Sequence, residues 1–188
     1  MEIVLGSQSP RRRELMAGLD VPFTAVTIDA DESYPAELQA GDIPFFVSRA
    51  KAHAYASKLT DDQLLITADT IVWSDGKMLG KPKDATEAVA MIQVLRNKTH
   101  QVYTAVTVAK RNQVLETVVD ETDVTFGNLT DEEIAYYVTK YRPLDKAGAY
   151  GVQEWIGYVA CIGMNGSYFN VMGFPVHKVY QLLKKYGE

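Results

Sequence analysis

The sequence predicts an α/β fold in which helices flank a mixed β-sheet. Short apolar runs typical of strands are interspersed with helical runs that begin at capping residues. In the middle of the chain, two long β patterns are separated only by a polar turn, which favours an antiparallel hairpin. The 188 residues are about the length of one domain, and such a chain can fold without a disulfide or metal. We therefore expect residues 1–188 to form a single domain.

The first third of the chain is expected to contain two strands, each followed by a helix. Ser9 is a favoured N-cap and Pro10 suits the first helical position, so a helix begins here, and Gly18 ends it. Asp42 and Pro44 open the second helix. The predicted strands cover residues 2–6 and 23–28, an acidic loop covers residues 29–33, and the second helix ends near residue 59.

The middle of the chain is dominated by β patterns. The strand expected at residues 64–73 is apolar apart from Asp69, and the Asp-Gly pair that follows predicts a hairpin turn. Asp84 and Glu87 have capping-box spacing for a helix that ends near residue 97, with Asp as a variant of the box. The two long β patterns lie around the polar turn at residues 110–113.

The last third is expected to contain helices at both ends. Thr130 and Glu133 form a second capping box, which opens a helix over residues 131–141. A loop follows, and short strands are predicted around residues 155–162 and 167–171. Pro175 begins the final helix.

Composition and charge exclude several classes of function. The net charge of −5 argues against broad binding of nucleic acid. No stretch approaches the ~20 apolar residues that span a bilayer, and the first residues lack the basic flank and cleavage site of a signal peptide. The one cysteine, Cys161, excludes an internal disulfide and is expected to be a core residue. We therefore expect a cytoplasmic protein with no nucleic-acid or membrane partner.

Three arginines stand where a helix disfavours them, in the stretch "SQSPRRREL". Arg11, Arg12 and Arg13 fall in the first helical turn, whose dipole is already positive. Free backbone N–H groups, the hydroxyls of Ser7 and Ser9 and the arginines together make a site for an anion. The alternative is a solvated basic turn. If Arg12 serves only the anion, Arg12→Gln should leave ligand-free stability unchanged or raise it by a few tenths of a kcal/mol.

Two lysines and two carboxylates extend this hypothesis. Lys51 lies among alanines on a predicted helix and Lys81 follows the hairpin, although each alone could be a solvated surface charge. Asp69 interrupts an apolar strand, where it caps a loop or serves a metal or the chemistry. Glu32 lies in the acidic loop. Because Mg²⁺ prefers one or two carboxylates plus phosphate oxygens, Glu32 and Asp69 opposite the cations indicate a metal-dependent phosphate site.

Five segments in order and spacing resemble the Maf family, and the match covers residues 4–175. They are "SQSPRRREL", "ADTIVWSDGKMLGKPKD", "THQVYTAV", "DKAGAYGVQ" and "NGSYFNVMGFP". The resemblance implies a hydrolase that converts a nucleoside triphosphate and water to the monophosphate and pyrophosphate, with Mg²⁺, Mn²⁺ or Co²⁺. It also implies an elongated fold related to inosine triphosphate pyrophosphatase, with a cleft between two lobes. Dimers are common in the family, so a homodimer is expected.

The resemblance also assigns roles by motif. Glu32 and Asp69 match the acidic catalytic and metal-binding pair, either of which would activate the attacking water. Gln153 matches a glutamine that helps to recognise the base, and Thr70 could bond a pyrimidine edge. The phosphate-binding residues matched are Ser7, Arg11, Arg12, Lys51 and Lys81.

The branch within the family is also indicated by particular residues. Arg11 after Pro10, the Ala68-Asp69-Thr70 run and the Lys146–Gln153 segment resemble the dTTP/UTP branch rather than the 7-methyl-GTP branch. Modified pyrimidine nucleotides are included in this expectation. The chain departs from the branch pattern at Arg96-Asn97-Lys98, at Ala105 and at Glu154. A nucleotide-sensing regulator linked to septum formation, which binds without turnover, remains the alternative.

Overall fold

The computed structural model describes residues 1–187 and contains one mixed β-sheet. The strand order is β2-β1-β3-β5-β6-β7, with β4 beside β3. β1 pairs in parallel with both β2 and β3, whereas β3–β4 and β6–β7 are antiparallel. The strands are β1 (Glu2–Gly6), β2 (Phe23–Val26), β3 (Gln63–Ser74), β4 (Lys77–Leu79), β5 (Thr99–Lys110), β6 (Gln113–Phe126) and β7 (Cys161–Asn165). The expected α/β class with a mixed sheet is confirmed.

The chain divides into two compact units. Unit 1 consists of residues 1–70, 104–120 and 173–188, and unit 2 of residues 71–103 and 121–172. Unit 1 carries the helices α1 (Pro10–Ala17), α2 (Asp42–Ala56) and α7 (Val176–Tyr186). Unit 2 carries α3 (Ala85–Leu95), α4 (Asp131–Tyr141), the 3₁₀ turn η1 (Ala147–Ala149), α5 (Trp155–Ala160) and α6 (Tyr168–Val171). The single-domain assignment and the cleft between lobes stay predictions.

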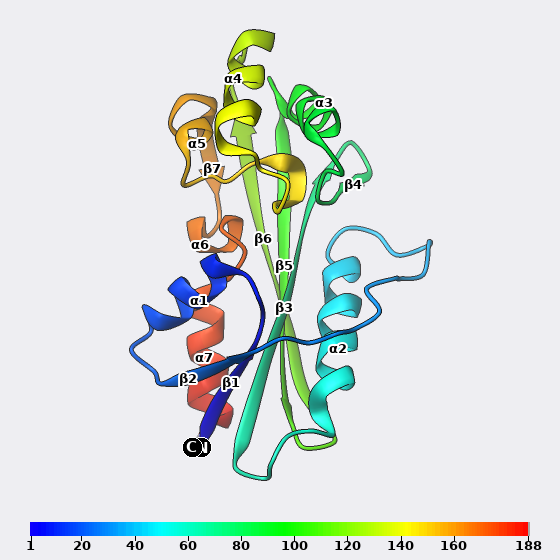
Figure 1. Cartoon of the computed structure of the whole chain (residues 1–188), viewed down its shortest axis with the longest axis vertical. Coiled ribbons are helices and arrows are strands. Elements are labelled where there is room, and N and C mark those ends of the chain that lie inside the picture. The colour runs from blue at the N-terminus through cyan, green and yellow to red at the C-terminus, as the bar shows by residue number, and fades with distance from the viewer. Residues whose placement is uncertain (188) are drawn as a thin grey trace. The chain divides into compact units, whose positions relative to one another are not determined.

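In unit 1, helices cover both faces of the strands, as Figure 1 shows. Successive side chains of a strand point to opposite faces, so β1 contributes to two cores. Ile3 and Leu5 pack in the cluster that includes Met16 of α1 and Leu182 of α7. Val4 packs on the other face, in the cluster that includes Ala52 of α2. Because helices pack on both faces, the ends of β1 and β3 and the neighbouring face of α2 are held in fixed positions.

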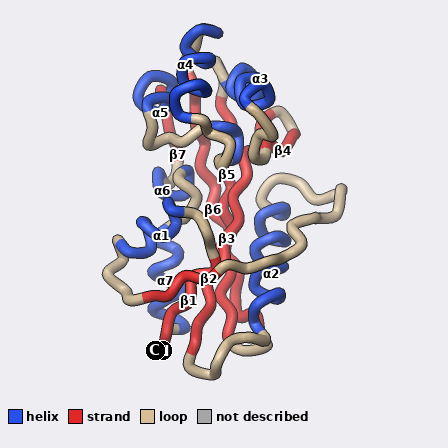
Figure 2. Tube along the Cα trace, in the orientation of Figure 1, coloured by secondary structure: helices blue, strands red, loops and turns tan. Residues whose placement is uncertain are grey.

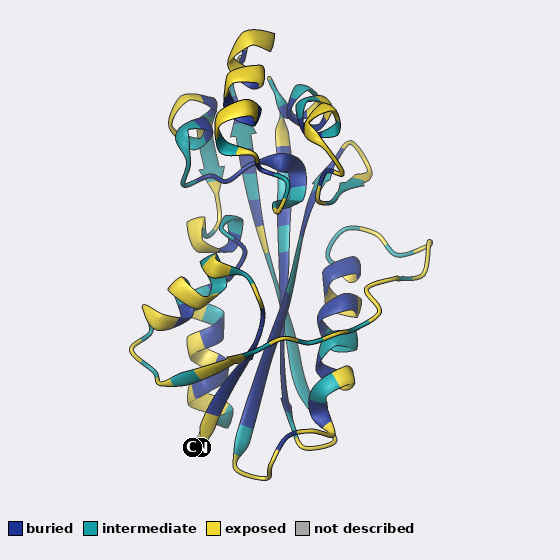
Figure 3. Ribbon diagram, in the orientation of Figure 1, coloured by how far each residue is buried: buried dark blue, intermediate teal, exposed yellow. Residues whose placement is uncertain are grey.

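In unit 2, helices α3, α4 and α5 bury their apolar faces in one core. The cluster joins Ile92 of α3, Ile134 of α4 and Ile156 of α5 with the strand residues Val124 and Phe126. Figure 3 shows that the residues of these helices alternate between buried and exposed, as expected for helices with one face in a core. This core supports the loop between α4 and α5, which carries Gln153.

Most predicted elements are confirmed, including the caps. Ser9 accepts a hydrogen bond from the backbone N–H of Arg12, and Thr130 and Glu133 form the complete capping box. Asp75 and Gly76 both adopt positive φ, 51° and 74°, as the tight β3–β4 turn requires. No helix within residues 1–187 is long and apolar enough to cross a membrane.

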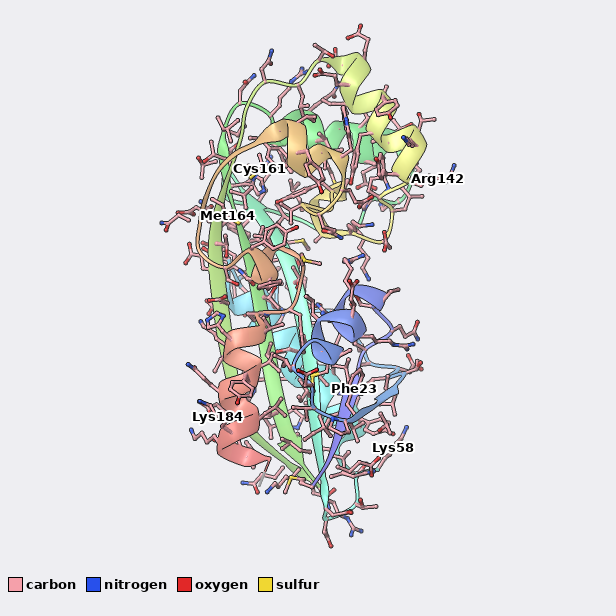
Figure 4. All side chains as sticks on the ribbon, turned by 90° about the vertical axis from the view of Figure 1, so that its left-hand side faces the viewer. Phe23, Lys58, Arg142, Cys161, Met164 and Lys184 are labelled. Atoms are coloured by element: carbon pink, nitrogen blue, oxygen red, sulfur yellow. The ribbon has the colours of Figure 1, made fainter. Side chains whose placement is uncertain are left out.

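The prediction of two short strands after Gln153 was wrong. Residues 155–160 and 168–171 form α5 and α6, and the strand β7 lies between them (Figure 2). Ile156 and Ala160 are fully buried while Tyr158 is 85% exposed, so burial follows a helical period in a segment too short to reveal it. Cys161, expected in the core, lies half-buried on β7, where Figure 4 also labels Met164.

Candidate active site

Two predicted carboxylates converge on one lysine in unit 1. Lys51 Nζ lies 2.9 Å from Asp69 Oδ1 and 3.1 Å from Glu32 Oε1. The Lys51 and Asp69 side chains are 13% and 16% exposed, whereas Glu32 is 57% exposed on its loop. Glu32 and Asp69, which are 37 positions apart in the sequence, therefore meet at a single ammonium group.

The fold places Lys51 through the packing of α2 on the sheet. Lys51 follows the buried Val47 and Ser48 by four and three residues, so it lies on the same helix face. The hydroxyl of Thr67 on β3 donates to the carbonyl of Ser48 at 2.7 Å. The Ser48 and Thr107 hydroxyls are 2.8 Å apart, which ties α2 to β5 as well. These bonds fix the helix so that the lysine reaches Asp69.

Asp69 is a carboxylate in a poorly solvated place. Burial raises its pKa above the ordinary value, although the charges of Lys51 and Arg12 act in the opposite direction. A raised pKa makes a carboxylate a better proton acceptor at neutral pH, which suits a general base. This raised pKa is the property that a general base at this position would need.

Arg12 is held by the protein itself. Its Nε donates to the carbonyl of Gly173 at 2.8 Å, its Nη1 to the carbonyl of Ala68 at 3.0 Å, and its Nη2 to the hydroxyl of Thr70 at 3.1 Å. Ala68 and Thr70 flank Asp69, so the guanidinium fixes the backbone on both sides of that carboxylate. The expectation that Arg12→Gln leaves ligand-free stability unchanged is therefore not supported by this geometry, because three hydrogen bonds would be lost.

The other residues of the arginine segment are arranged around the start of α1. Ser7 is 8% exposed, and its hydroxyl accepts from the backbone N–H of Ser9 at 3.2 Å. Arg13 is exposed and its Nε donates to the carbonyl of Ser7 at 3.3 Å. Arg11 is half-buried at the second position of the helix. The backbone N–H groups of Ser9, Arg12 and Arg13 therefore all have acceptors within this segment, and the anion site stays a prediction.

The hydroxyl of Thr70 takes part in a local network. It lies 2.8 Å from the hydroxyl of Thr104 on β5 and also accepts from Arg12. Sequence reasoning singled out neither Thr104 nor Gly173. A threonine within a β pattern and a glycine before a helix carry no signal of their own. The pairing of β3 with β5 brings Thr104 to Thr70, and the segment before α7 brings the Gly173 carbonyl to Arg12.

Lys81 and Gln153 belong to unit 2. Lys81 is exposed, directly after Gly80, whose carbonyl accepts from the backbone N–H of Gly148 at 3.1 Å. That bond joins the Lys81 loop to the loop that leads to Gln153. Gln153 is half-buried, and its Oε1 is a buried oxygen without a hydrogen-bond partner among the described residues. Within unit 2 the two predicted residues therefore lie on loops that are bonded to each other.

The donor set fits a divalent cation that also binds substrate. Among residues 1–187, no group of three or more His, Cys, Asp or Glu side chains could hold a metal ion. Glu32 and Asp69 nevertheless reach one cation, the Lys51 ammonium, at about the same distance. Mg²⁺ commonly uses one or two protein carboxylates and takes its other ligands from phosphate and water, so two converging carboxylates suffice.

Comparisons with known proteins identify the family to which this chain is similar. The family model described as "Maf-like protein" matches residues 2–186. A protein of Bacteroides thetaiotaomicron named dTTP/UTP pyrophosphatase is 52% identical over 98% of this chain and 95% of the relative. A protein of Porphyromonas gingivalis with the same name is 51% identical over 100% and 95%. The Ham1 protein of Staphylococcus aureus has a similar fold, with a TM-score of 0.51 at 16% identity and full coverage of both chains.

Proposed function

The chain belongs to the Maf family, and we propose from this premise that it hydrolyses dTTP and UTP to the monophosphate and pyrophosphate. The observation that carries the proposal is the convergence of Glu32 and Asp69 on Lys51 in unit 1. Relatives that are about half identical over nearly their whole length are named for this activity, which supports the enzyme over the nucleotide sensor.

The reaction needs a water molecule that attacks the α-phosphorus. Asp69, whose pKa is raised by burial, would accept a proton from this water, and Glu32 would help to orient it. A bond forms between the water oxygen and the α-phosphorus while the bond to the bridging oxygen of the leaving pyrophosphate breaks. Lys51, already bonded to both carboxylates, would keep them close to each other and offer a positive charge to the phosphate oxygens.

A divalent cation, Mg²⁺ with Mn²⁺ or Co²⁺ as alternatives, would be held by Glu32 and Asp69 and would neutralise charge that develops on the phosphates. The hydroxyl of Ser7 and the guanidinium of Arg11 would bind phosphate oxygens, and Lys81 would add a further cation. Arg12 would act chiefly by fixing the backbone around Asp69.

Base recognition is assigned to Gln153. Its Oε1 lacks a partner among the described residues and can accept a hydrogen bond, and thymine and uracil both offer an N3–H donor. Thr70, the other predicted contact, already shares its hydroxyl with Arg12 and Thr104. We also propose that the enzyme works in the cytoplasm, as its single cysteine suggests, and as a homodimer, as is common in the family.

A nucleotide panel tests the proposal. The full chain is incubated with Mg²⁺ and, separately, dTTP, UTP, CTP, GTP and ATP, and the products are separated by ion-exchange chromatography. We expect monophosphate and pyrophosphate from dTTP and UTP, and no products once the cation is chelated. Orthophosphate with a diphosphate as the first products, or no turnover of either nucleotide, would contradict the assignment.

A further inference from the structure

Glu154, which departs from the residue pattern of its branch, uses its side chain in an unexpected way. It occupies the N-cap position of α5, yet its carboxylate makes no cap hydrogen bond to that helix. Glu154 Oε1 instead lies 3.2 Å from Lys146 Nζ and accepts a hydrogen bond from the Tyr137 hydroxyl at 3.3 Å. The Lys146 and Glu154 side chains are only 13% and 18% exposed. The ion pair therefore joins the two ends of the loop 146–154.

Tyr137 of α4 connects this ion pair to the middle of the loop. Its ring is fully buried, and its hydroxyl accepts from the backbone N–H of Gly151 at 3.0 Å while it donates to Glu154. Burial raises the pKa of Tyr137, and the negative charge of Glu154 acts in the same direction. The hydroxyl consequently stays protonated and can donate to the carboxylate throughout the working pH range.

The side chains of Lys146, Gln153 and Glu154 come together over Gly151. A Cβ at Gly151 would be 2.4 Å from Glu154 Oε1, 2.9 Å from Lys146 Cε and 3.2 Å from Gln153 Nε2. The three side chains thus pack directly over the glycine Cα, in space that only glycine leaves open. The Gln153 amide is set beside the ion pair, with its Oε1 buried and without a hydrogen-bond partner in the described part of the chain.

We propose that Glu154 is a positioning residue for base selection, which acts with Lys146 to hold the Gln153 amide in one orientation. The inference rests on the proposed function, because it assigns the means by which that site selects a base. Gln153 Oε1, which is buried without a partner among the described residues, would accept the N3–H of a bound thymine or uracil. Cytosine has an acceptor at N3, so it faces an acceptor and is disfavoured. An amide freed from the ion pair can rotate and present its NH₂ group to cytosine instead.

Substitution of Glu154 by glutamine tests this inference, because the amide oxygen can still accept from Tyr137 while the buried charge beside Lys146 is removed. Lys146 Nζ then keeps its other carboxylate partner, the more exposed Asp145 at 3.0 Å. With Mg²⁺, we expect a several-fold higher KM for dTTP and a kcat within about twofold of the parent, since the reacting groups are elsewhere. The preference for dTTP over dCTP should fall roughly tenfold. The matched control is Glu132→Gln on the exposed first turn of α4, which should leave KM, kcat and the preference unchanged.

Binding measured without turnover separates this inference from the proposed function. Calorimetric titration of dTMP and dCMP in the presence of a chelator should show the parent preferring dTMP and Glu154→Gln losing that preference, whether or not the chain hydrolyses triphosphates. Lys146→Gln should have the same effect, and the double variant should lose little more than either single variant, because both remove one interaction.

Three results would overturn the inference. The first is a parent that binds dTMP and dCMP equally well. The second is Glu154→Gln and Lys146→Gln variants that remain folded and keep the preference of the parent. The third is a failure of both variants to fold, judged by thermal unfolding, because the ion pair would then be a support of unit 2 and not a means of base selection.

Discussion

Replacement of Arg12 by glutamine tests whether this residue fixes the backbone of β3 around Asp69 or only binds an anion. The guanidinium makes three hydrogen bonds, to the carbonyls of Gly173 and Ala68 and to the hydroxyl of Thr70. Glutamine can replace at most one of them. A hydrogen bond from a charged donor contributes about 1.5–3 kcal/mol, and the lower value applies here because Arg12 is half-buried.

The two bonds lost therefore cost about 3 kcal/mol of unfolding free energy, and the removal of a positive charge from the helix N-terminus returns roughly 0.5 kcal/mol. For a chain of this length, the net loss lowers the Tm by roughly 5–10 °C. Because Ala68 and Thr70 flank Asp69, the turnover of dTTP should also fall at least roughly tenfold.

Differential scanning calorimetry of the ligand-free chain and steady-state kinetics measure the two effects. Arg13→Gln is the matched control: this neighbouring arginine is exposed and makes one longer bond, so its loss should cost less than about 1 kcal/mol. If Arg12→Gln unfolds within about 0.5 kcal/mol of the parent, the guanidinium does not hold these carbonyls, and the positioning role is refuted.

Further predictions concern the carboxylates, the lysine and a buried histidine. Asp69→Asn and Glu32→Gln should each abolish pyrophosphate release while circular dichroism shows an unchanged fold; near-normal turnover would remove that residue from the catalytic set. The pH profile of kcat/KM should have an acid limb above the ordinary aspartate pKa of 3.8, because burial raises the pKa of Asp69 and the base is lost as pH falls through it. Lys51→Met should move this limb to still higher pH, since the ammonium charge lowers that pKa; an unshifted limb would exclude Asp69 as the titrating group. Burial lowers the pKa of His100 to about 4, so the unfolded chain binds its proton first and the unfolding free energy should fall by roughly 3 kcal/mol between pH 6.5 and pH 4. His100→Gln should remove that part of the pH dependence in urea titrations, and an equal loss in parent and variant would contradict the assignment.

The sequence predicted the elements whose signals are local. The caps at Ser9 and Thr130 and the turn at Asp75-Gly76 depend on neighbouring residues, so the pattern was sufficient. It failed after Gln153, where the apolar run at residues 155–160 is too short for a helical and a strand period to be distinguished.

In the candidate site, too, some features could be predicted from the sequence and others could not. The convergence of Glu32, Lys51 and Asp69 was expected from residue types and the family resemblance, and the structure brings these three together. The bonds of Arg12 could not be predicted, because its partners are two backbone carbonyls and a hydroxyl up to 161 residues away. The sequence marked Glu154 only as a departure from the branch pattern. Its proposed role could be inferred only from the structure, which places Lys146 beside it.

The fate of the attacking oxygen tests the central claim most directly, namely that water is activated beside Asp69 and attacks the α-phosphorus. Hydrolysis of dTTP in ¹⁸O-labelled water, followed by mass spectrometry of both products, locates the bond that breaks. We predict one labelled oxygen in dTMP and none in pyrophosphate, with no labelled product from Asp69→Asn. Label in pyrophosphate would place the attack on the β-phosphorus and would contradict the account.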